Sequence, residues 1–478
     1  MGAMSRAALV VVVVASCYRA NAPAGAPCSA DGECPTPLVC VASTCTANGV
    51  DAGQVTYDDA APPADAPSDL TCECSGSATL ACSDGSTTPC DISCADAGSA
   101  GPAHCTTLTP SNNVSTDLLT GTAALAISNF TVFNTDTGAV TGGLVRAAGS
   151  GVIAGVAYGQ AMSGGHSLGV FAFEALTVAS GATIHFNGVR AAVFLVGGQA
   201  IVAGTVDLSG GCYGKQISCA GPGGGAGAID TATPGGCGPG APGISDDSTG
   251  ADTGGGGGAF GGTGGTGGTE TASGVGFDGG GGGAACAPFD LVPLIGGGGG
   301  GGGGPGSGTP TSGGGGGGGL QISALGSITI SGTINAGGGG GDTGPTNVDN
   351  GGAPGGGGAG GAILLESPSV TLASGGVLAA NGGGGGGATD HLIAGGTGQP
   401  GQASTAPATG GAAANGGTGN GGNGGSRQAA PGNGGDSTDV NSGAGGGSVG
   451  RIFIRSVGGA TLSGAVSPPA VNSNVHSQ

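Results

Sequence analysis

Residues 328–334 read Ile-Thr-Ile-Ser-Gly-Thr-Ile, and the pattern returns as Val-Thr-Leu-Ala-Ser-Gly-Gly-Val at 370–377 and Ala-Thr-Leu-Ser-Gly-Ala-Val at 460–466. Apolar side chains alternate with small ones in each copy, which is typical of a half-buried strand. A small residue and glycine then break the strand before a second apolar pair follows. Related copies at 176–184 and 200–206 indicate a true internal repeat.

The spacing of the copies indicates how the chain stacks. A second apolar run precedes the later copies, at 320–322, 362–364 and 452–454. Val178 and Val202 are 24 residues apart, which suits one rung of a right-handed parallel β-helix, whereas Ile330 and Leu372 are 42 apart. The longer interval is one rung with a glycine excursion, or two rungs. We therefore expect a mainly β protein with a β-helix or solenoid-like body; the alternative is a β-sandwich with disordered glycine loops.

Glycine dominates the excursions, with 123 glycines among 478 residues. Stretches such as 254–269 and 415–426 have a local period of three. That period suits an extended helix of three residues per turn, in which positions without side chains let neighbouring chains hydrogen-bond closely. Flexible disorder is the competing interpretation, because ordering glycine costs more than ordering other residues.

The N-terminus has the pattern of an export signal. Arg6 precedes the apolar run 7–15, which is too short to span a bilayer, and Val14-Ala15-Ser16-Cys17 follows. This stretch resembles the lipobox of bacterial lipoproteins. The resemblance implies a signal peptide over 1–16, a diacylglycerol on Cys17 and a tether over 17–27; secretion without a lipid is the alternative. Tyr18 follows the cysteine where inner-membrane retention signals often place Asp, which favours the outer membrane.

Fourteen of the fifteen cysteines remain after Cys17, and they form three even groups. An even number of cysteines in each group of an exported chain predicts disulfides within the group, with a zinc site as the alternative for the second group. The connectivity within a group is open. The disulfide candidates are Cys28, Cys34, Cys40 and Cys45; Cys72, Cys74, Cys82, Cys90, Cys94 and Cys105; and Cys212, Cys219, Cys237 and Cys286.

These features divide the chain into successive regions. A four-cysteine module over 28–45 is followed by an acidic Pro/Ala linker over 46–71 and a six-cysteine module over 72–105. The body comprises a β-rich start over 106–210, a glycine-rich region with four cysteines over 211–319, and β repeats with glycine excursions over 320–478.

Two further resemblances bear on the origin of these regions. The module 28–45, with its C-x5-C-x5-C-x4-C spacing, resembles four-cysteine repeats of predicted myxobacterial lipoproteins. Residues 150–470 resemble glycine-rich proteins of the PE-PGRS type by composition, and adhesin-like β-helix proteins of Gram-negative bacteria. The PE domain that heads the first of these families is absent from this sequence.

Charge and chemistry exclude several function classes. The net charge is −20 and Lys215 is the single lysine, so phosphate backbones would be repelled and nucleic acid is not expected as a partner. No histidine pair has metal-ligand spacing, and no phosphate-binding loop or tandem calcium repeat occurs. His166 and His391 have polar neighbours, and Asp207 is the best solitary carboxylate beside a strand. We predict no catalytic residue, no metal and no cofactor.

The sequence favours a non-enzymatic cell-surface lipoprotein with a structural, adhesive or interaction role. Its partners would be the membrane, through the lipid anchor, and an extracellular glycan, surface or protein; its location would be the outer membrane, facing the periplasm or the exterior. One alternative is a carbohydrate-active β-helix enzyme, which needs acids and an arginine in one groove. Another is an ice- or surface-binding module, which needs an outward threonine ladder such as Thr329, Thr371 and Thr461.

Overall fold

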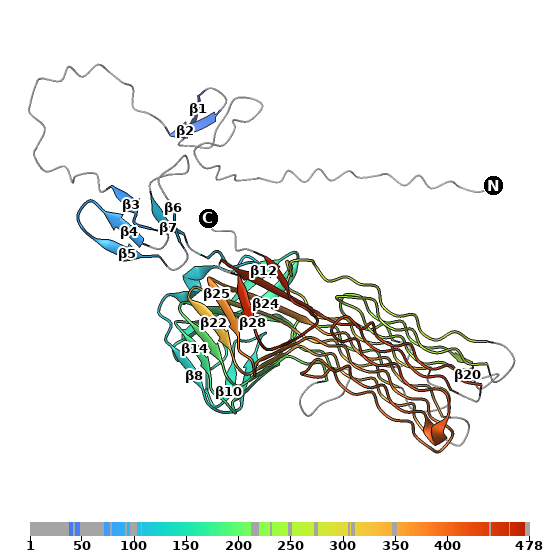
Figure 1. Cartoon of the computed structure of the whole chain (residues 1–478). Coiled ribbons are helices and arrows are strands. Elements are labelled where there is room, and N and C mark those ends of the chain that lie inside the picture. Colours follow the sequence, from blue (N-terminus) through green and yellow to red (C-terminus); the bar gives the residue numbers. More distant parts are fainter. Residues whose placement is uncertain are drawn as a thin grey trace, which may run out of the picture. The chain divides into compact units, whose positions relative to one another are not determined.

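The computed structural model divides the chain into two compact units, residues 1–69 and 70–478. It describes residues 38–41, 44–47, 71–76, 79–90, 93–95, 103–106, 108–211, 219–229, 232–246, 251–271, 276–304, 306, 311–346, 351–438, 441–457 and 459–473. In the first unit, β1 (Leu38–Val41) and β2 (Thr44–Ala47) form an antiparallel hairpin (Figure 1). The predictions for Cys17, Cys28, Cys34 and Cys212 lie outside the described residues, as do the side chains of Cys40 and Cys45.

The six-cysteine region forms two small antiparallel sheets held by disulfides. One contains β3 (Cys72–Cys74), β4 (Thr79–Cys82) and β5 (Thr87–Pro89), and the other contains β6 (Ser93–Ala95) and β7 (His104–Thr106). The predicted local disulfides are present in this region. They join Cys72 to Cys82, Cys74 to Cys94, and Cys90 to Cys105.

The rest of the second unit is built on three large sheets, which confirms the prediction of a mainly β body. The described helices are two short 3₁₀ helices, η1 (Thr116–Leu119) and η2 (Ala414–Gly416). The eight-stranded sheet contains, in spatial order, β11 (Gly151–Ile153), β12 (Val156–Ser163), β13 (His166–Phe173), β16 (Ala191–Val196), β21 (Gly319–Ala324), β24 (Ala362–Ser367), β27 (Arg451–Ser456) and β30 (Val471–Ser473).

The other two sheets are shorter. The seven-stranded sheet contains β10 (Val140–Gly142), β9 (Thr131–Asn134), β15 (Thr183–Asn187), β18 (Thr205–Asp207), β23 (Thr333–Asn335), β26 (Val377–Ala379) and β29 (Ala465–Ser467). The six-stranded sheet contains β28 (Ala460–Leu462), β25 (Ser369–Leu372), β22 (Ser327–Ile330), β17 (Ala200–Val202), β14 (Leu176–Val178) and β8 (Leu125–Ile127).

Successive triplets of strands add one strand to each of the three sheets. The first such triplet is β13, β14 and β15, the next is β16, β17 and β18, and the pairs between triplets are parallel. Val178 pairs with Val202, and Ile330 pairs directly with Leu372. The interval of 42 residues between Ile330 and Leu372 therefore contains one glycine excursion. We call the part formed by these strands the three-sheet body.

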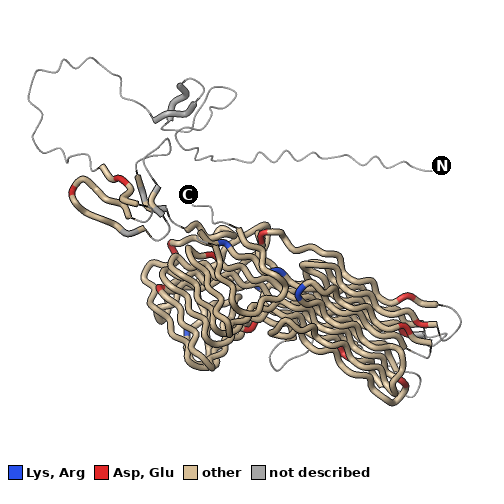
Figure 2. The backbone as a smooth tube through the Cα atoms, viewed as in Figure 1, with Lys and Arg blue, Asp and Glu red and all other residues tan. Residues whose placement is uncertain are grey.

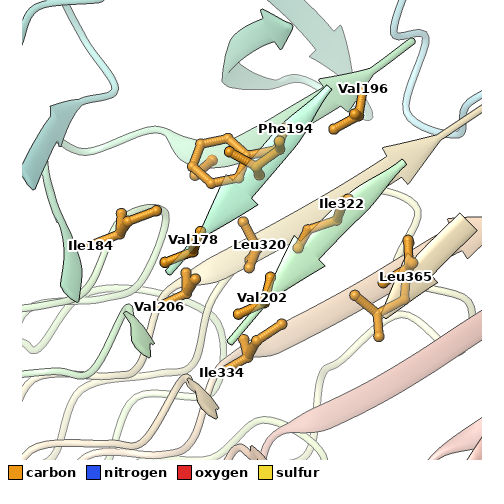
Figure 3. Packing of buried hydrophobic residues seen from close by; sticks show 14 of the residues in the cluster. Val178, Ile184, Phe194, Val196, Val202, Val206, Leu320, Ile322, Ile334 and Leu365 are labelled. Atoms are coloured by element: carbon orange, nitrogen blue, oxygen red, sulfur yellow. The ribbon is translucent and has the colours of Figure 1, made fainter. Parts of the chain in front are cut away.

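The core of the three-sheet body lies on the inner faces of the sheets. Along β16, Phe194 and Val196 face this core, whereas Val193 and Leu195 belong to a second apolar cluster on the opposite face of the eight-stranded sheet. Side chains alternate between the faces of a strand, so β16 is buried throughout because both of its faces are covered. Figure 3 shows Phe194 together with Val, Ile and Leu side chains of successive strands in this core.

The glycine excursions all leave and return at one corner of the three-sheet body. They follow β18, β23 and β26 of the seven-stranded sheet and end at β21, β24 and β27 of the eight-stranded sheet. Figure 1 shows their segments running side by side, away from the strands, to turns near β20 (Ala251–Asp252). β20 pairs with β19 (Ser245–Asp246). We call the described parts of residues 219–318, 336–361 and 380–450 the glycine lattice, and its end away from the three-sheet body the tip.

Candidate functional site

The glycine lattice is held together by hydrogen bonds between backbones, with a period of three residues. In the tract 355–361, amides 355, 358 and 361 donate to residues 336–342, amides 356 and 359 to residues 298–301, and amides 357 and 360 to residues 445–448. The N–O distances are 2.7–3.0 Å. A chain that meets the same neighbour at every third residue has three residues per turn, which is the polyproline II geometry predicted from the glycine repeats.

The close approach of the tracts explains why the interior positions are glycine. A Cβ built on Gly357 would lie 2.7 Å from the carbonyl carbon of Gly383 and 2.8 Å from the oxygen of Gly384, and it would clash directly with the oxygen of Gly383. These are backbone atoms of a neighbouring tract, which no side-chain rotation can move. Close backbone contact between tracts thus gives a steric reason for glycine at these positions; the sequence alone had left order and disorder of the tracts open.

Side chains appear on the lattice where a tract reaches its surface. Thr263 and Thr266 are exposed and three residues apart, with glycines between them. The amide of Thr266 donates to the side-chain oxygen Oδ1 of Asn433 at 3.0 Å, while the amide of Gly434 in the same tract donates to the carbonyl of Thr266 at 2.8 Å. Asn423 accepts from the amide of Gly410 at 2.9 Å in the same way. Asparagines at the surface therefore satisfy amides that interior tracts satisfy with carbonyls.

A tight turn at the tip carries exposed apolar side chains. Asp390 and Ile393 exchange two backbone hydrogen bonds of 3.0 and 2.8 Å, so the turn between them is closed. Leu392 is 66% exposed and Ile393 is 48% exposed. The Nδ1 atom of His391 lies 2.6 Å from Oδ1 of Asp390, and Nδ2 of Asn415 donates to Oδ2 at 2.7 Å. These two hydrogen bonds hold the pKa of the Asp390 carboxyl below its ordinary value.

A row of polar side chains lies on the outer face of the seven-stranded sheet. His185, Asp207 and Asn335 occupy paired positions on β15, β18 and β23. The Nδ1 atom of His185 lies 3.4 Å from Oδ2 of Asp207, and Nδ2 of Asn335 donates to Oδ1 at 3.3 Å. The amide of Ser209 also donates to Oδ1, at 3.1 Å. The Asp207 side chain is thereby fixed in one orientation, while it remains 21% exposed.

His185 and Asp207 of this row line a hollow beside the glycine lattice. The first hollow has a volume of about 240 Å³, and Phe130 stands in its wall beside His185, with ring centroids 5.3 Å apart. A second hollow of about 570 Å³ is lined by lattice backbone and by Asp342. Gly211 is among the lining residues of both hollows. Burial raises the pKa of the Asp342 carboxyl.

A second cluster brings an acid and an arginine together, as the enzyme hypothesis requires. Ser323, Glu366 and Arg455 pair across β21, β24 and β27, and Nη1 of Arg455 lies 3.2 Å from Oε1 of Glu366. The Glu366 side chain is 1% exposed and also accepts hydrogen bonds from Ser323 and Ser111. This carboxylate is buried and fully engaged, so it anchors residue 111 to the sheet and does not face an open groove.

The remaining histidine with polar neighbours, His166, lies beside a hairpin turn. It pairs with Ser163 at the end of the β12–β13 hairpin, where Gly164 and Gly165 have φ values of 54° and 85°. Positive φ at both central positions is what a type I′ two-residue hairpin turn requires. The exposure of His166 follows from that turn.

Threonines form a partial ladder on the outer face of the six-stranded sheet. Thr329 pairs with Thr371, and Thr371 pairs with Thr461. On the other side of Thr329 the paired residue is Ile201, followed by Thr177. These threonines lie on the outer face, where Thr329 and Thr371 are half-buried, and Ile201 interrupts the ladder.

In the third cysteine group, Cys237 and Cys286 form a disulfide and Cys219 is also disulfide-bonded. The bridge ties two loops of the first excursion together across 49 residues. In the part of the chain that the structure describes, no group of three or more His, Cys, Asp or Glu residues could hold a metal ion. No helix within the same part is long and apolar enough to span a membrane.

Comparison of the chain with models of protein families, with curated protein sequences and with solved structures gave no match in any of the three.

Proposed function

We propose that this chain is a non-enzymatic cell-surface protein whose glycine lattice is a rigid arm that displays its tip for adhesion. The observation that carries the proposal is the pairing of every amide in the tract 355–361 with one of three neighbouring tracts. A flexible glycine linker would leave these amides to water. The order of the lattice instead supports a role in which the distance between body and tip has to be fixed.

The topology of the three-sheet body supports a parallel β-helix, and we propose that its coil is right-handed. Parallel crossover connections within a sheet are almost always right-handed. The pairing of Val178 with Val202 and of Ile330 with Leu372 agrees with stacked rungs. Such a body would give the lattice a firm base, because every rung shares its core with the next.

Export and lipidation at Cys17 would place this arm on the outer membrane, facing the periplasm or the exterior. The disulfides of the six-cysteine region support an oxidising compartment, where such bonds persist. Incorporation of labelled palmitate into the chain, lost in Cys17→Ser, tests the anchor. Incorporation that persists in this variant would contradict it.

The tip supplies the adhesive surface in this proposal. Leu392 and Ile393 are apolar, exposed and held in a closed turn, which is a suitable contact for an apolar pocket of a partner protein. Figure 2 shows Asp and Glu residues both on the three-sheet body and along the lattice out to the tip, whereas the described Arg residues lie on or near the three-sheet body. An acidic tip would disfavour acidic partners and strongly acidic membrane surfaces.

Two measurements test the arm and the tip separately. Hydrogen exchange should protect amides 355–361 as strongly as the strand 362–367, and rapid exchange in the lattice alone would contradict a rigid arm. Beads coated with the chain should adhere to cells of the producing organism. The Leu392→Ser/Ile393→Ser variant should lose most of this adhesion, whereas Val152→Ser, at a site 46% exposed on β11, should retain it.

A second candidate function rests on the threonine ladder. Thr329, Thr371 and Thr461 stand in register at the strand spacing of about 4.8 Å, which favours ordered water and an ice- or surface-binding face. Thermal hysteresis of the chain, abolished by Thr371→Lys, would support this function. The enzyme alternative gains no comparable observation, because Glu366 is buried and paired.

A further inference from the structure

We propose that the C-terminal end of the three-sheet body binds an extended segment of a partner protein. The segment adds a further pair of strands to two of the sheets and places a carboxylate beside Arg427. The inference goes beyond the adhesive function proposed above and does not depend on the tip.

The last strand of each large sheet has one strand neighbour. In the described part of the chain, β28, β29 and β30 are the final strands of the six-, seven- and eight-stranded sheets, and they pair with β25, β26 and β27. The other side of an edge strand presents backbone N–H and C=O groups to which another strand can bind. We call the end formed by β28, β29 and β30 the open end.

The apolar core is only partly covered at the open end. Leu372 and Leu378 are fully buried, whereas Leu462 and Val466, which pair with them on the last strands, are half-buried. Leu462 and Val466 line a hollow of about 690 Å³, together with residues 427–429, Pro469 and Ala470. In a stacked repeat each rung covers the apolar side chains of the one before it. The hollow therefore lies where the apolar side chains of a further rung would pack.

The other end of the three-sheet body is closed by its own chain. Arg146 lies between β10 and β11, the final strands at that end of their sheets, and is 1% exposed. Its guanidinium donates to the carbonyl oxygens of Gly138, Gly151 and Val156 and lies over the ring of Tyr158. A terminal repeat needs such a cover to separate its apolar core from water. The open end is the one that offers room for a partner.

A lattice turn holds a cation at the rim of the hollow. Arg427 is exposed and has a φ of 49°, a left-handed backbone conformation that residues other than glycine rarely adopt. Two backbone hydrogen bonds between Ser426 and Ala429 close the turn, and the amide of Arg427 donates to Oγ of Ser467 on β29 at 2.8 Å. Such backbone conformations cluster at functional sites.

The charge around Arg427 selects an acidic partner. No Asp or Glu is among the described residues that line the hollow, and the sequence from 451 to 478 contains neither. Among the described residues, the arginines in ion pairs are Arg190 and Arg455. A carboxylate from a partner would compensate Arg427. A second copy of the open end would instead bring another Arg427 to the same place, and like charges repel.

The repeat of the chain indicates which sequence fits. Through the intervening rungs, Val202 aligns with Leu462 and Val206 aligns with Val466. A partner segment with the sequence of 200–206, Ala-Ile-Val-Ala-Gly-Thr-Val, would therefore place its two aligned valines over these half-buried side chains. Its Ala-Gly step would turn the same corner that Ser-Gly turns between β28 and β29.

The same alignment gives the position of the carboxylate. Asp207 aligns with Ser467, whose Oγ accepts from the amide of Arg427. Neighbouring strands lie about 4.8 Å apart, so an aspartate one strand beyond Ser467 is within reach of the Arg427 side chain. The partner segment is thus extended and apolar, with a glycine between its two strands and an acidic residue at its end.

The test uses the full chain with Cys17→Ser, produced in an oxidising compartment, and fluorescence anisotropy of labelled peptides. The first peptide has the sequence of residues 199–208, and the second carries Asp207→Asn. We expect saturable binding of the first, and binding of the second that is about three- to fivefold weaker, as suits an exposed ion pair. Hydrogen exchange of amides 460–467 should slow when the first peptide binds.

Variants of the chain locate the two contacts. Arg427→Gln should weaken the acidic peptide about three- to fivefold and leave the affinity for the Asn peptide unchanged. Val466→Thr keeps the side-chain shape but sets a hydroxyl against the peptide, and should weaken both peptides about tenfold.

Two substitutions serve as matched controls. Arg451→Gln removes a positive charge from the same rung outside the hollow, and Val152→Thr alters an exposed edge-strand valine at the other end. Both should change affinity less than about twofold. Arg427→Gln alters an exposed side chain, so it keeps the test decisive if Val466→Thr fails to fold, as judged by hydrogen exchange of β14.

Several results would overturn the proposal. They are the absence of peptide binding, equal affinity for the two peptides, unchanged exchange at 460–467, or an effect of Val152→Thr as large as that of Val466→Thr. Two further results would reassign the hollow if the peptide does not bind. A dimer of the parent chain that is lost in Val466→Thr would assign it to a second copy, and binding of dodecanoate would assign it to an amphiphile. None of these outcomes bears on the rigid lattice or the adhesive tip.

Discussion

Two substitutions of glycine by alanine in the lattice should change stability in opposite directions. Gly357 lies inside, where an added Cβ would clash with the backbone at Gly383 and meet the oxygen of Gly384 at 2.8 Å. Gly281 lies on the surface of the same lattice, and a Cβ there meets no atom within 4 Å. Neither residue has the positive φ that would strain alanine. The pair therefore separates packing from the intrinsic effect of removing a glycine.

The magnitudes follow from these contacts. Inserting a methyl group into a fully packed site costs about 1–3 kcal/mol, because neighbouring atoms have to shift. Moving the neighbouring tract away would also weaken the hydrogen bonds from Gly357 to Gly445 and from Gly383 to Gly358, both 2.9 Å, at about 1 kcal/mol each. Gly357→Ala should thus destabilise the lattice by about 3–5 kcal/mol. Gly281→Ala should stabilise it by about 0.4–1 kcal/mol, because alanine restricts the unfolded chain.

Native-state hydrogen exchange measures both effects at the lattice itself. The free energy of opening at amides 355–361 should fall in Gly357→Ala and rise slightly in Gly281→Ala. Exchange in β14 and β17, within the three-sheet body, reports whether the change is local. Equal opening free energies in the two variants, within about 0.5 kcal/mol, would refute the packed lattice.

Three other changes test the remaining contacts. Glu366→Ala should destabilise the three-sheet body by about 1–3 kcal/mol in chemical denaturation, since it removes a buried carboxylate that pairs with Arg455 and leaves the buried donors of Ser323 and Gln321 without their acceptor; a change below about 0.5 kcal/mol would contradict this. Asn423→Ala should accelerate exchange of the Gly410 amide, and Asn423→Asp, which keeps the accepting oxygen, should not. Asn415→Ala should raise the pKa of Asp390 in a carbon NMR titration. Because the folded pKa of Asp390 is depressed, the tip turn of the parent chain should lose stability as pH falls below about 3.8, through the folded value. An unchanged Asp390 pKa in Asn415→Ala would contradict a contribution of the Asn415 hydrogen bond to this depression.

The strands of the three-sheet body could be predicted from the sequence because their side chains carry the pattern. Ile328, Val370 and the residues that follow them alternate, and their paired positions coincide with the aligned repeats. The same alignment held a signal for the polar row on the seven-stranded sheet, which sequence reasoning missed. His185, Asp207 and Asn335 each follow a Thr-Ile or Thr-Val pair, so they are equivalent positions of successive repeats. Asp207 was predicted as a solitary carboxylate, whereas the structure gives it two polar neighbours.

The arrangement of the glycine tracts could not be predicted in the same way. The period of three indicates the local helix, but it does not say which tract lies beside which. Residues 355–361 contact tracts around 300, 340 and 446, and nothing in a run of glycines distinguishes these neighbours. The Asp390 turn likewise depends on a hydrogen bond from Asn415, which lies in a later segment of the same excursion.

The corner at which every excursion begins and ends has a consequence for how the chain folds. Tracts made of glycine are interchangeable with one another, so they cannot select their own neighbours or their own alignment. That information lies in the strands on either side: β18 and β21, β23 and β24, and β26 and β27 fix where each excursion starts and stops. The lattice should therefore assemble last, on a scaffold of already paired strands. A substitution that delays strand pairing should yield chains whose glycine tracts are joined in the wrong order, even though every tract is unaltered.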